Sequence, residues 1–316
     1  MADEFTEANA ASITPEEMQA AIESSGYLLE GRIARVLQER GLWAEPNAFR
    51  VDPNDANKTI EVDVIGRTLE WINEENKSTA AVSILVECKN NVQPFAFFVE
   101  PQQVAEVNLS RIRCDGFPAF SRNANTQVPE LLQDLLGMKE WHHYCHASEI
   151  ATRFCGFARA NEKKKWKAEP MNQYSCSFSN VALMSAVDTD PSIATNLQNI
   201  QLQLAYPVAV FQGPIYEVRE AMGKITVEKV SHLQLHHFAT LNGQMVQAQI
   251  DVVTEHAFPA LVDKILNEVK TFRDRINALY PRLLNSALDQ KRVATQNAAR
   301  QMFQAHMTPS VTHSSY

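Results

Sequence analysis

The chain has 316 residues, with 37 Asp and Glu against 29 Lys and Arg, and a formal net charge of −8 at pH 7. This acidic balance excludes a polycation that coats nucleic acid without regard to site. Apolar residues make up 45% of the chain and charged residues 21%, which is typical of a globular protein and not of a disordered one. The length suits one large α/β domain or two smaller ones.

Nothing in the sequence favours a membrane or an oxidising compartment. No uninterrupted apolar stretch approaches the roughly 18 residues of a membrane span, and the first ten residues are acidic, unlike a signal peptide. The chain holds an odd number of widely spaced cysteines and is too large to need disulfides: Cys88, Cys114, Cys145, Cys155 and Cys176. We therefore expect a cytoplasmic protein with reduced thiols and no membrane partner.

The first ordered elements are predicted to be two helices. Residues 1–13 are polar and small, and are expected to form a loose arm. Thr14-Pro15-Glu16-Glu17 then combines a capping hydroxyl, a proline at the first helical position and a glutamate at N3. Apolar residues at helical spacing predict helices over 15–24 and 26–40, and Gly41 marks the end of the second.

Two strands are predicted next. In 59–67 apolar and polar residues alternate, with the two-residue period of a half-buried strand. After a polar loop over 71–79, the segment 81–89 is continuously apolar until its last residues, which indicates a more deeply buried strand.

The second half of the chain, 126–307, is predicted to be an additional α/β region. Strand-like runs cover 206–211, 215–219, 226–239 and 245–254, and Asn242-Gly243 is a hairpin signal. Helical segments over 258–276 and from 281 to about 307 follow, and 308–316 is expected to be a flexible tail. The predicted fold class is therefore α/β, with a central mixed sheet flanked by helices.

A set of charged side chains suits phosphodiester hydrolysis. The period of a strand places Glu87 and Lys89 on one face, and Val86 and Cys88 on the other, toward the core. Asp63 lies on the preceding strand, which a hairpin-like connection could bring alongside. Asp63 and Glu87 could then share one divalent cation, the ion that such hydrolysis requires.

The order of Glu30 on a helix, Asp63 on a strand and Glu87-x-Lys89 at the end of the next strand resembles the PD-(D/E)xK, or restriction-endonuclease-like, superfamily. The resemblance covers roughly residues 15–113, and we assign 14–125 to a nuclease-like core that is either separate from 126–307 or continuous with it. Val62 stands where the family motif has proline, a departure from the pattern.

The resemblance implies an αβββαβ core and a metal-dependent nuclease. Mg²⁺ or Mn²⁺ would be bound by Asp63, Glu87 and the Cys88 carbonyl, and Lys89 would position or activate water. Glu30 would match a helix glutamate that some members use to reach a second metal or its waters. The implied partner is nucleic acid, with DNA favoured over RNA, and a homo-oligomer is left open.

Simpler interpretations stay open beside this one. Glu30 could lie on a solvated helix face, Asp63 and Glu61 on the wet side of the sheet, and Glu87 and Lys89 in an ordinary ion pair. In that case the E-x-K match is accidental. The chain could also be a catalytically inactive binding or assembly protein that keeps a nuclease-like scaffold.

Other polar clusters are assigned simpler roles. The segment 141–146 lacks the paired spacing of zinc ligands, so we predict an amphipathic helix with surface histidines, His142, His143 and His146. His232 and His236 would share one face of a strand, in packing or at the surface. The basic run 163–167, with Trp166, is predicted to be a solvated loop in preference to a nucleic-acid contact.

Several enzyme classes lack their motifs. The sequence contains no phosphate-binding G-x-x-x-x-G-K-S/T loop, no G-x-G-x-x-G turn and no G-x-S-x-G elbow. ATP hydrolysis, dinucleotide binding and serine hydrolase chemistry are therefore not expected.

Overall fold

The structure is a computed structural model that describes residues 13–279, apart from 53, 74–77, 92, 103–111, 116–119, 123–128, 132–135, 160–164, 171, 189–200 and 242. The predicted arm, the helical segment beginning at 281 and the tail therefore lie outside the described residues. In the described part of the chain, no helix is both long enough and apolar enough to cross a membrane.

The two N-terminal helices confirm the prediction to within a residue. Helix α1 spans Pro15–Ser24 and α2 spans Tyr27–Glu39. The Thr14 hydroxyl accepts a hydrogen bond from the Glu17 backbone N–H at 3.2 Å, and the Glu17 carboxylate accepts one from the Thr14 N–H at 2.9 Å. Both bonds satisfy amide groups that the start of a helix otherwise leaves without partners.

The strands that carry the candidate residues form an antiparallel meander. β1 (Trp43–Asp52) pairs with β2 (Asp55–Asn73), and β2 pairs with β3 (Ser78–Lys89). The predicted strands over 59–67 and 81–89 lie inside β2 and β3. On its other side β3 pairs in parallel with β10 (Gln201–Phe211), which pairs in parallel with β14 (Gln244–Thr254).

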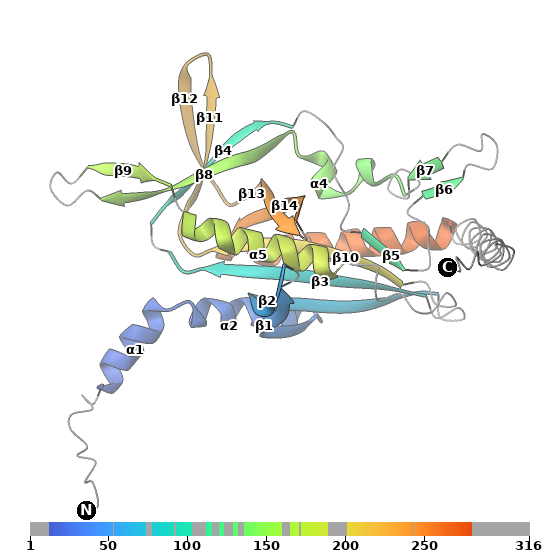
Figure 1. Cartoon of the computed structure of the whole chain (residues 1–316), viewed down its shortest axis with the longest axis horizontal. Coiled ribbons are helices and arrows are strands. Elements are labelled where there is room, and N and C mark those ends of the chain that lie inside the picture. The colour runs from blue at the N-terminus through green and yellow to red at the C-terminus, as the bar shows by residue number, and fades with distance from the viewer. Residues whose placement is uncertain are drawn as a thin grey trace, which may run out of the picture.

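These strands belong to one mixed sheet of 12 strands, whose central path runs β1-β2-β3-β10-β14-β13-β8-β4-β11-β12. The members not yet named are β4 (Phe95–Pro101), β5 (Ile112–Asp115), β8 (Glu149–Arg159), β9 (Trp166–Glu169), β11 (Ile215–Ala221), β12 (Lys224–Val230) and β13 (His232–Leu241). β6 (Phe120–Arg122) and β7 (Pro129–Leu131) form a separate pair. Figure 1 shows the hairpins β8-β9 and β11-β12 projecting from the body.

The C-terminal strand predictions are confirmed in kind but corrected in one place. The predicted single strand over 226–239 is two strands, β12 and β13, which Ser231 separates. β12 pairs with β11 in the projecting hairpin, whereas β13 returns to pair with β14. β13 and β14 form the hairpin that Asn242-Gly243 predicted, and Gly243 has the positive φ of 75° that such turns favour.

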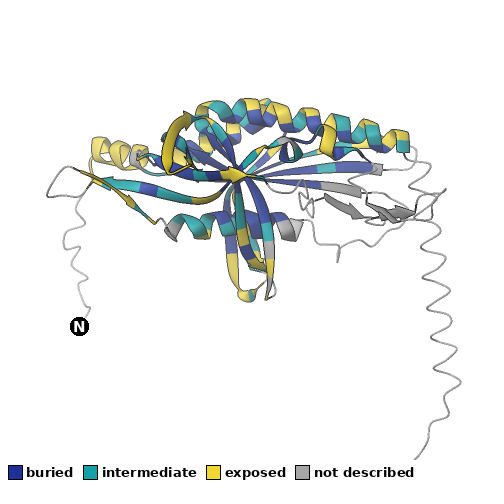
Figure 2. Cartoon of the chain, turned by 90° about the horizontal axis from the view of Figure 1, so that it is seen from above, coloured by how far each residue is buried: buried dark blue, intermediate teal, exposed yellow. Residues whose placement is uncertain are grey.

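Helices cover both faces of the sheet (Figure 2). The buried stripe of α2 packs with the helix over residues 258–279 against one face, in a core that includes Val82, Ile84 and Val86 of β3. Helix α5 (Asn172–Asp188) packs against the other face, with Leu85 of β3 in that core. The alternation along β3 therefore serves two cores, which explains its continuous apolar sequence.

One glycine sets how closely α2 approaches the sheet. A Cβ at Gly66 of β2 would lie 2.9 Å from the Leu37 side chain of α2, closer than real contacts allow. The missing side chain lets Leu37, which is fully buried, rest on β2. This contact holds α2, and with it Glu30, over the strand that carries Asp63.

Candidate active site

The candidate residues of β2 and β3 meet where β3 ends. Val64 lies opposite Val86 in the antiparallel register, so Asp63 is the neighbour of the Glu87 end of β3. The Asp63 carboxylate accepts a hydrogen bond from the Cys88 backbone N–H at 2.6 Å. The Cys88 side chain is buried in the core, as the strand period predicted.

Glu87 and Lys89 form a buried ion pair. Lys89 Nζ donates to Glu87 Oε1 at 2.6 Å and to the Ser177 hydroxyl of α5 at 2.7 Å. It also lies 5.6 Å from the centre of the Tyr174 ring, one turn earlier on α5. Glu87 is only 6% exposed, and its second oxygen, Oε2, is buried with no hydrogen-bond partner in the described part of the chain.

The charges of neighbouring carboxyl groups raise the pKa values of Glu87 and Glu30. Burial raises the pKa of Glu87 to about 7; the positive charge of Lys89 offsets part of that rise, the Asp63 charge adds to it, and hydrogen bonds from Lys89 and Ser177 lower it again in part. Burial also raises the pKa of Asp63, against the Cys88 hydrogen bond and Lys89. The pKa of Glu30 is raised by burial and then by the charges of Asp63 and Glu61. A cluster of negative groups with one cation, Lys89, is therefore short of positive charge.

Some of the predicted site residues are in direct contact, and others lie close enough only for electrostatic interaction. Glu87 and Lys89 touch, whereas Asp63 and Glu30 are linked to them through electrostatic interactions. The trio Glu30, Asp63 and Glu87 does not bring three ligand atoms within 4.8 Å of one another. Among the described residues, only His142, His143 and Glu268 do so.

The simpler interpretation accounts for part of this arrangement. The Glu87–Lys89 ion pair that it predicted is present, and Glu61 is exposed. Asp63 and Glu30 are half-buried, which differs from a fully solvated face. Neither interpretation supplies a partner for Glu87 Oε2.

A second polar cluster lies deep in the protein, and it corrects the prediction of surface histidines for His142 and His143; the side chain of His146 lies outside the described residues. His142 and His143 are 2% and 3% exposed, at the start of the short helix α4 (His143–His146). The prediction was wrong because the residues that bind these rings come from β14 and from the helix over 258–279, which no local pattern connects to them.

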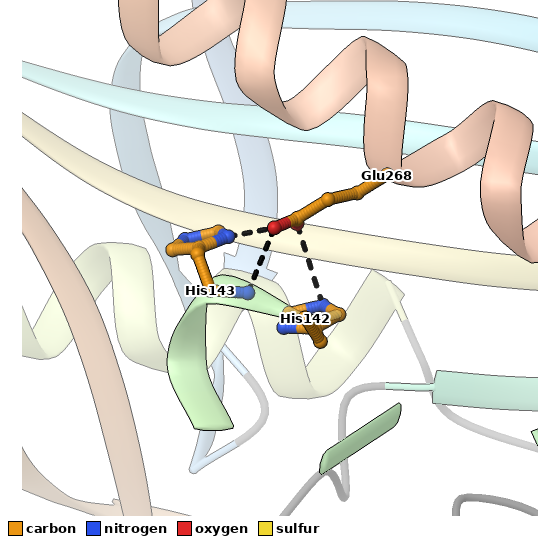
Figure 3. Close-up of side chains that lie close together, drawn as sticks. All are labelled: His142, His143 and Glu268. Carbon is orange, nitrogen blue, oxygen red and sulfur yellow. Dashed lines mark hydrogen bonds and ion pairs between the residues drawn. The ribbon is translucent and has the colours of Figure 1, made fainter. Parts of the chain in front are cut away.

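His143 lies between two buried carboxylates. Its Nδ1 is 2.7 Å from Glu268 Oε2, its Nε2 is 3.0 Å from Asp251 Oδ2, and its backbone N–H donates to Glu268 Oε1 at 2.7 Å. Figure 3 shows Glu268 reaching both histidines. Burial lowers the pKa of His143, but the two carboxylates more than offset this and raise it to about 9, so the ring is an imidazolium at neutral pH.

Asp251 is the most heavily bonded carboxylate of this cluster. Its Oδ2 also accepts from the Tyr144 hydroxyl at 2.8 Å, and its Oδ1 lies 2.8 Å from His232 Nε2. Burial raises its pKa, but the charge and hydrogen bond of His143, together with His232, pull it well below the usual range. His232 is thus partly packed and His236 does not share this contact; His236 lies beside Gln247.

Three residues of these clusters were not predicted as polar site residues: Ser177, Asp251 and Glu268. Two of them carried a usable signal. Asp251 interrupts the apolar run Ile250, Val252, Val253, and Glu268 falls on the apolar stripe of its helix next to Val269. A charged residue on a core-facing position indicates a buried partner. Ser177 carried no such signal.

The basic run that was predicted to be a solvated loop is partly described. Lys163 and Lys164 lie outside the described residues. Trp166 and Lys167 begin β9 and are exposed, and the guanidinium of Arg159 lies 5.0 Å from the centre of the Trp166 ring. The strand assignment corrects the loop for these two residues.

Comparison of the chain with protein-family models, with curated proteins and with solved structures gives no match. Function therefore follows from the two clusters alone. The buried group His142, His143 and Glu268 could hold a metal ion.

Proposed function

We propose that this chain is a metal-dependent nuclease that hydrolyses phosphodiester bonds, in DNA in preference to RNA, at a site formed by Asp63, Glu87 and Lys89. The observation that carries the proposal is Glu87 Oε2, a buried carboxylate oxygen without a hydrogen-bond partner among the described residues. Buried polar atoms nearly always have partners, and an exception calls for an explanation such as a missing ion. A divalent cation is the partner that suits this oxygen.

The order of elements supports the proposal. Helix α2, strands β1, β2 and β3, helix α5 and strand β10 follow one another as α-β-β-β-α-β. This is the core order that the PD-(D/E)xK resemblance implies, with the segment 90–171 inserted before α5. Glu30 lies on the first helix, Asp63 on the second strand, and Glu87 and Lys89 on the third.

The donor atoms fit Mg²⁺ or Mn²⁺, which prefer oxygen ligands. Asp63 and Glu87 would hold the cation, with the Cys88 carbonyl as a third ligand. When bound, the ion would neutralise charge on a phosphate and lower the pKa of a coordinated water. It would also lower the raised pKa of Glu87, because a positive charge beside a buried carboxylate favours its ionised form.

Lys89 is suited to the role of an electrostatic partner. Its ammonium group is held by Glu87 and Ser177 at the edge of the site, so its position is fixed. A fixed positive charge stabilises the negative charge that develops on a phosphate during hydrolysis.

A shallow pocket beside the site could receive the substrate backbone. Its volume is about 450 Å³, and its lining combines Arg32, Arg35 and His256 with Glu39 and Glu255; Arg32 forms an ion pair with Glu255. Gln212, also in the lining, donates its backbone N–H to the Lys89 carbonyl at 3.0 Å, which places the pocket next to the end of β3. Arg35 is exposed there, and arginine is a preferred contact for phosphate oxygens.

One observation favours a second candidate function, that of an inactive nuclease-fold binding or assembly protein. Lys89 is bonded to both Glu87 and Ser177, which is also the arrangement of a structural ion pair. Titration with Mn²⁺ separates the two candidates. A competent site raises the melting temperature by mass action, and Asp63→Asn removes that rise.

The decisive experiment measures cleavage of single-stranded DNA, duplex DNA and RNA by the purified chain with Mg²⁺ or Mn²⁺. Lys89→Ala and Asp63→Asn should each lower the rate by at least about 100-fold, a typical contribution of such groups, while cooperative unfolding is retained. Glu61→Gln is the matched control, because Glu61 is an exposed carboxylate two residues from Asp63. If the wild-type chain cleaves no substrate with either metal, or if Glu61→Gln is as inactive as Asp63→Asn, the nuclease proposal is wrong.

A further inference from the structure

Two histidines and a glutamate from distant parts of the chain converge inside the protein (Figure 3). His143 Nδ1 lies 2.7 Å from Glu268 Oε2, and His142 Nε2 lies 3.8 Å from the same oxygen. The ligand atoms of all three residues are within 4.8 Å of one another. Two ligands of one tetrahedral ion at about 2.0–2.2 Å lie roughly 3.4 Å apart, so binding zinc would open the His143–Glu268 pair and close the His142–Glu268 pair, each by a few tenths of an ångström.

Asp251 holds one of these histidines in a suitable orientation for a metal. It bonds to His143 Nε2 at 3.0 Å, and it is itself fixed by Tyr144 and His232. A proton on Nε2 that is donated to Asp251 leaves the lone pair on Nδ1, which faces Glu268. A carboxylate behind the ring is the usual support for a histidine that binds a metal.

The charges of the cluster favour a divalent cation over a proton. Asp251 and Glu268 are both buried, with 0% and 6% exposure, and between them His143 carries a single positive charge. An excess negative charge inside a protein is unfavourable. A divalent ion bound between Glu268 and two neutral imidazoles balances the charges of both carboxylates.

The ion also has a route to the cluster. A surface pocket of about 500 Å³ is lined by Trp141 and Glu268, together with residues of the first turns of the same helix. Glu268 therefore faces both the buried histidines and a pocket from which an ion and water can arrive.

We propose that His142, His143 and Glu268 bind Zn²⁺ and that the ion ties the 142–143 segment to the helix over 258–279. Two imidazole nitrogens and one carboxylate oxygen form a donor set that zinc favours. Water or the Tyr206 hydroxyl, which lies 3.4 Å from His142 Nε2, completes the coordination. Ligation through His142 Nε2 requires the proton on Nδ1, so the 3.3 Å hydrogen bond from the Tyr144 N–H to Nδ1 opens. This site is independent of the proposed nuclease site.

The test uses the full chain, stripped with a chelator and then titrated with ZnCl₂. Bound zinc is counted by elemental analysis after gel filtration, and thermal unfolding is followed in parallel. We expect one zinc ion per chain and a higher melting temperature. His142→Asn and Glu268→Gln should each weaken binding by more than about 100-fold, because even residues that only orient metal ligands contribute 10- to 100-fold.

Two further variants make the result specific. Tyr144→Phe removes a donor to Asp251 and should weaken zinc binding by about tenfold. Glu87→Gln alters the proposed nuclease site and should leave zinc binding unchanged, so failure of one proposal is distinguishable from failure of the other. Should Glu268→Gln fail to fold, His142→Asn carries the test, because it leaves the hydrogen bonds between His143, Glu268 and Asp251 in place. Absence of bound zinc in the wild-type chain, or equal affinity in His142→Asn, overturns the proposal.

Discussion

Glu87 and Asp251 are both carboxylates that the fold removes from water, but their surroundings differ. Asp251 accepts hydrogen bonds at both oxygens and faces a protonated histidine, so its pKa is lowered. Glu87 has one bonded oxygen and one without a described partner, and its pKa is raised to about 7. Burial raises the pKa of both carboxyl groups. The neighbouring residues therefore determine that Asp251 has hydrogen-bond partners and a counter-charge, whereas Glu87 is less well balanced.

The largest expected effect comes from disrupting the cluster of His143, Asp251 and Glu268. His143→Phe leaves Asp251 and Glu268 buried without the imidazolium between them. Removing one partner of a buried ion pair costs about 3–5 kcal/mol, so we expect that loss in the free energy of unfolding. The measurement is urea denaturation in the presence of a chelator.

The exposed histidine of the 3-10 turn after β14 is the control for this variant. His256→Gln should change the free energy of unfolding by less than about 0.5 kcal/mol, as surface substitutions usually do. A loss below about 1 kcal/mol in His143→Phe would mean that the carboxylates simply take up protons, and the cluster would not be an ionic one.

The next largest effect concerns Glu87, and it depends on pH. The folded-state pKa of Glu87, about 7, lies above the ordinary value of 4.5. The free-energy cost of ionising the buried Glu87 in the folded chain is therefore absent below about pH 4.5. It grows as the pH rises and is complete above about pH 7. Glu87→Gln also leaves Lys89 without its carboxylate partner, a cost that does not depend on this titration. Since one pKa unit is about 1.4 kcal/mol, the change in unfolding free energy caused by Glu87→Gln should be more favourable at pH 8 than at pH 5 by about 1–3 kcal/mol in the metal-free chain.

Chemical denaturation at the two pH values, with a chelator present, measures this difference. Glu61→Gln, an exposed neighbour, should show no such dependence. Equal stability changes at pH 5 and pH 8 in Glu87→Gln would mean that Glu87 is ionised at both, with its charge already balanced.

The smallest expected effects come from removing one hydroxyl from each cluster. Tyr144→Phe deletes a donor to the fully buried Asp251 and should cost about 1–2 kcal/mol of unfolding free energy. Ser177→Ala should cost less than about 1 kcal/mol, because Lys89 keeps its bond to Glu87 and Ser177 itself is only half-buried. Parallel thermal and urea melts compare the two. The reverse order would show that the Lys89 cluster, not the Asp251 cluster, is the structural one.

Local signals in the sequence were enough to predict the helices and the strands that carry the candidate residues. The capping residues around Thr14 set the start of α1, alternation revealed β2, and a nearly continuous apolar run revealed β3. The Asn242-Gly243 pair predicted the β13-β14 hairpin, since its partners are adjacent in the chain. In each of these cases the interacting residues lie close together in sequence.

The remaining features depend on contacts between distant residues. Nothing near β3 indicates that β10 is its other neighbour, because parallel pairing across a long insertion has no turn to mark it. His143 meets carboxylates 108 and 125 positions away, so its six-residue surroundings suggested a surface helix. The lone acids Asp251 and Glu268 within apolar patterns were the available hint of a buried charge network.

The pairing of β3 with β10 has a consequence for how the chain is made. Thr79 pairs with Gln201, and Lys89 with Phe211, so one edge of a largely apolar strand lacks its neighbour until translation has passed residue 211. An open edge of this kind can pair with other chains, and such long-range parallel pairing forms slowly. The nascent chain is therefore most prone to aggregate while the segment 90–200 is being synthesised, when a chaperone has the most to protect.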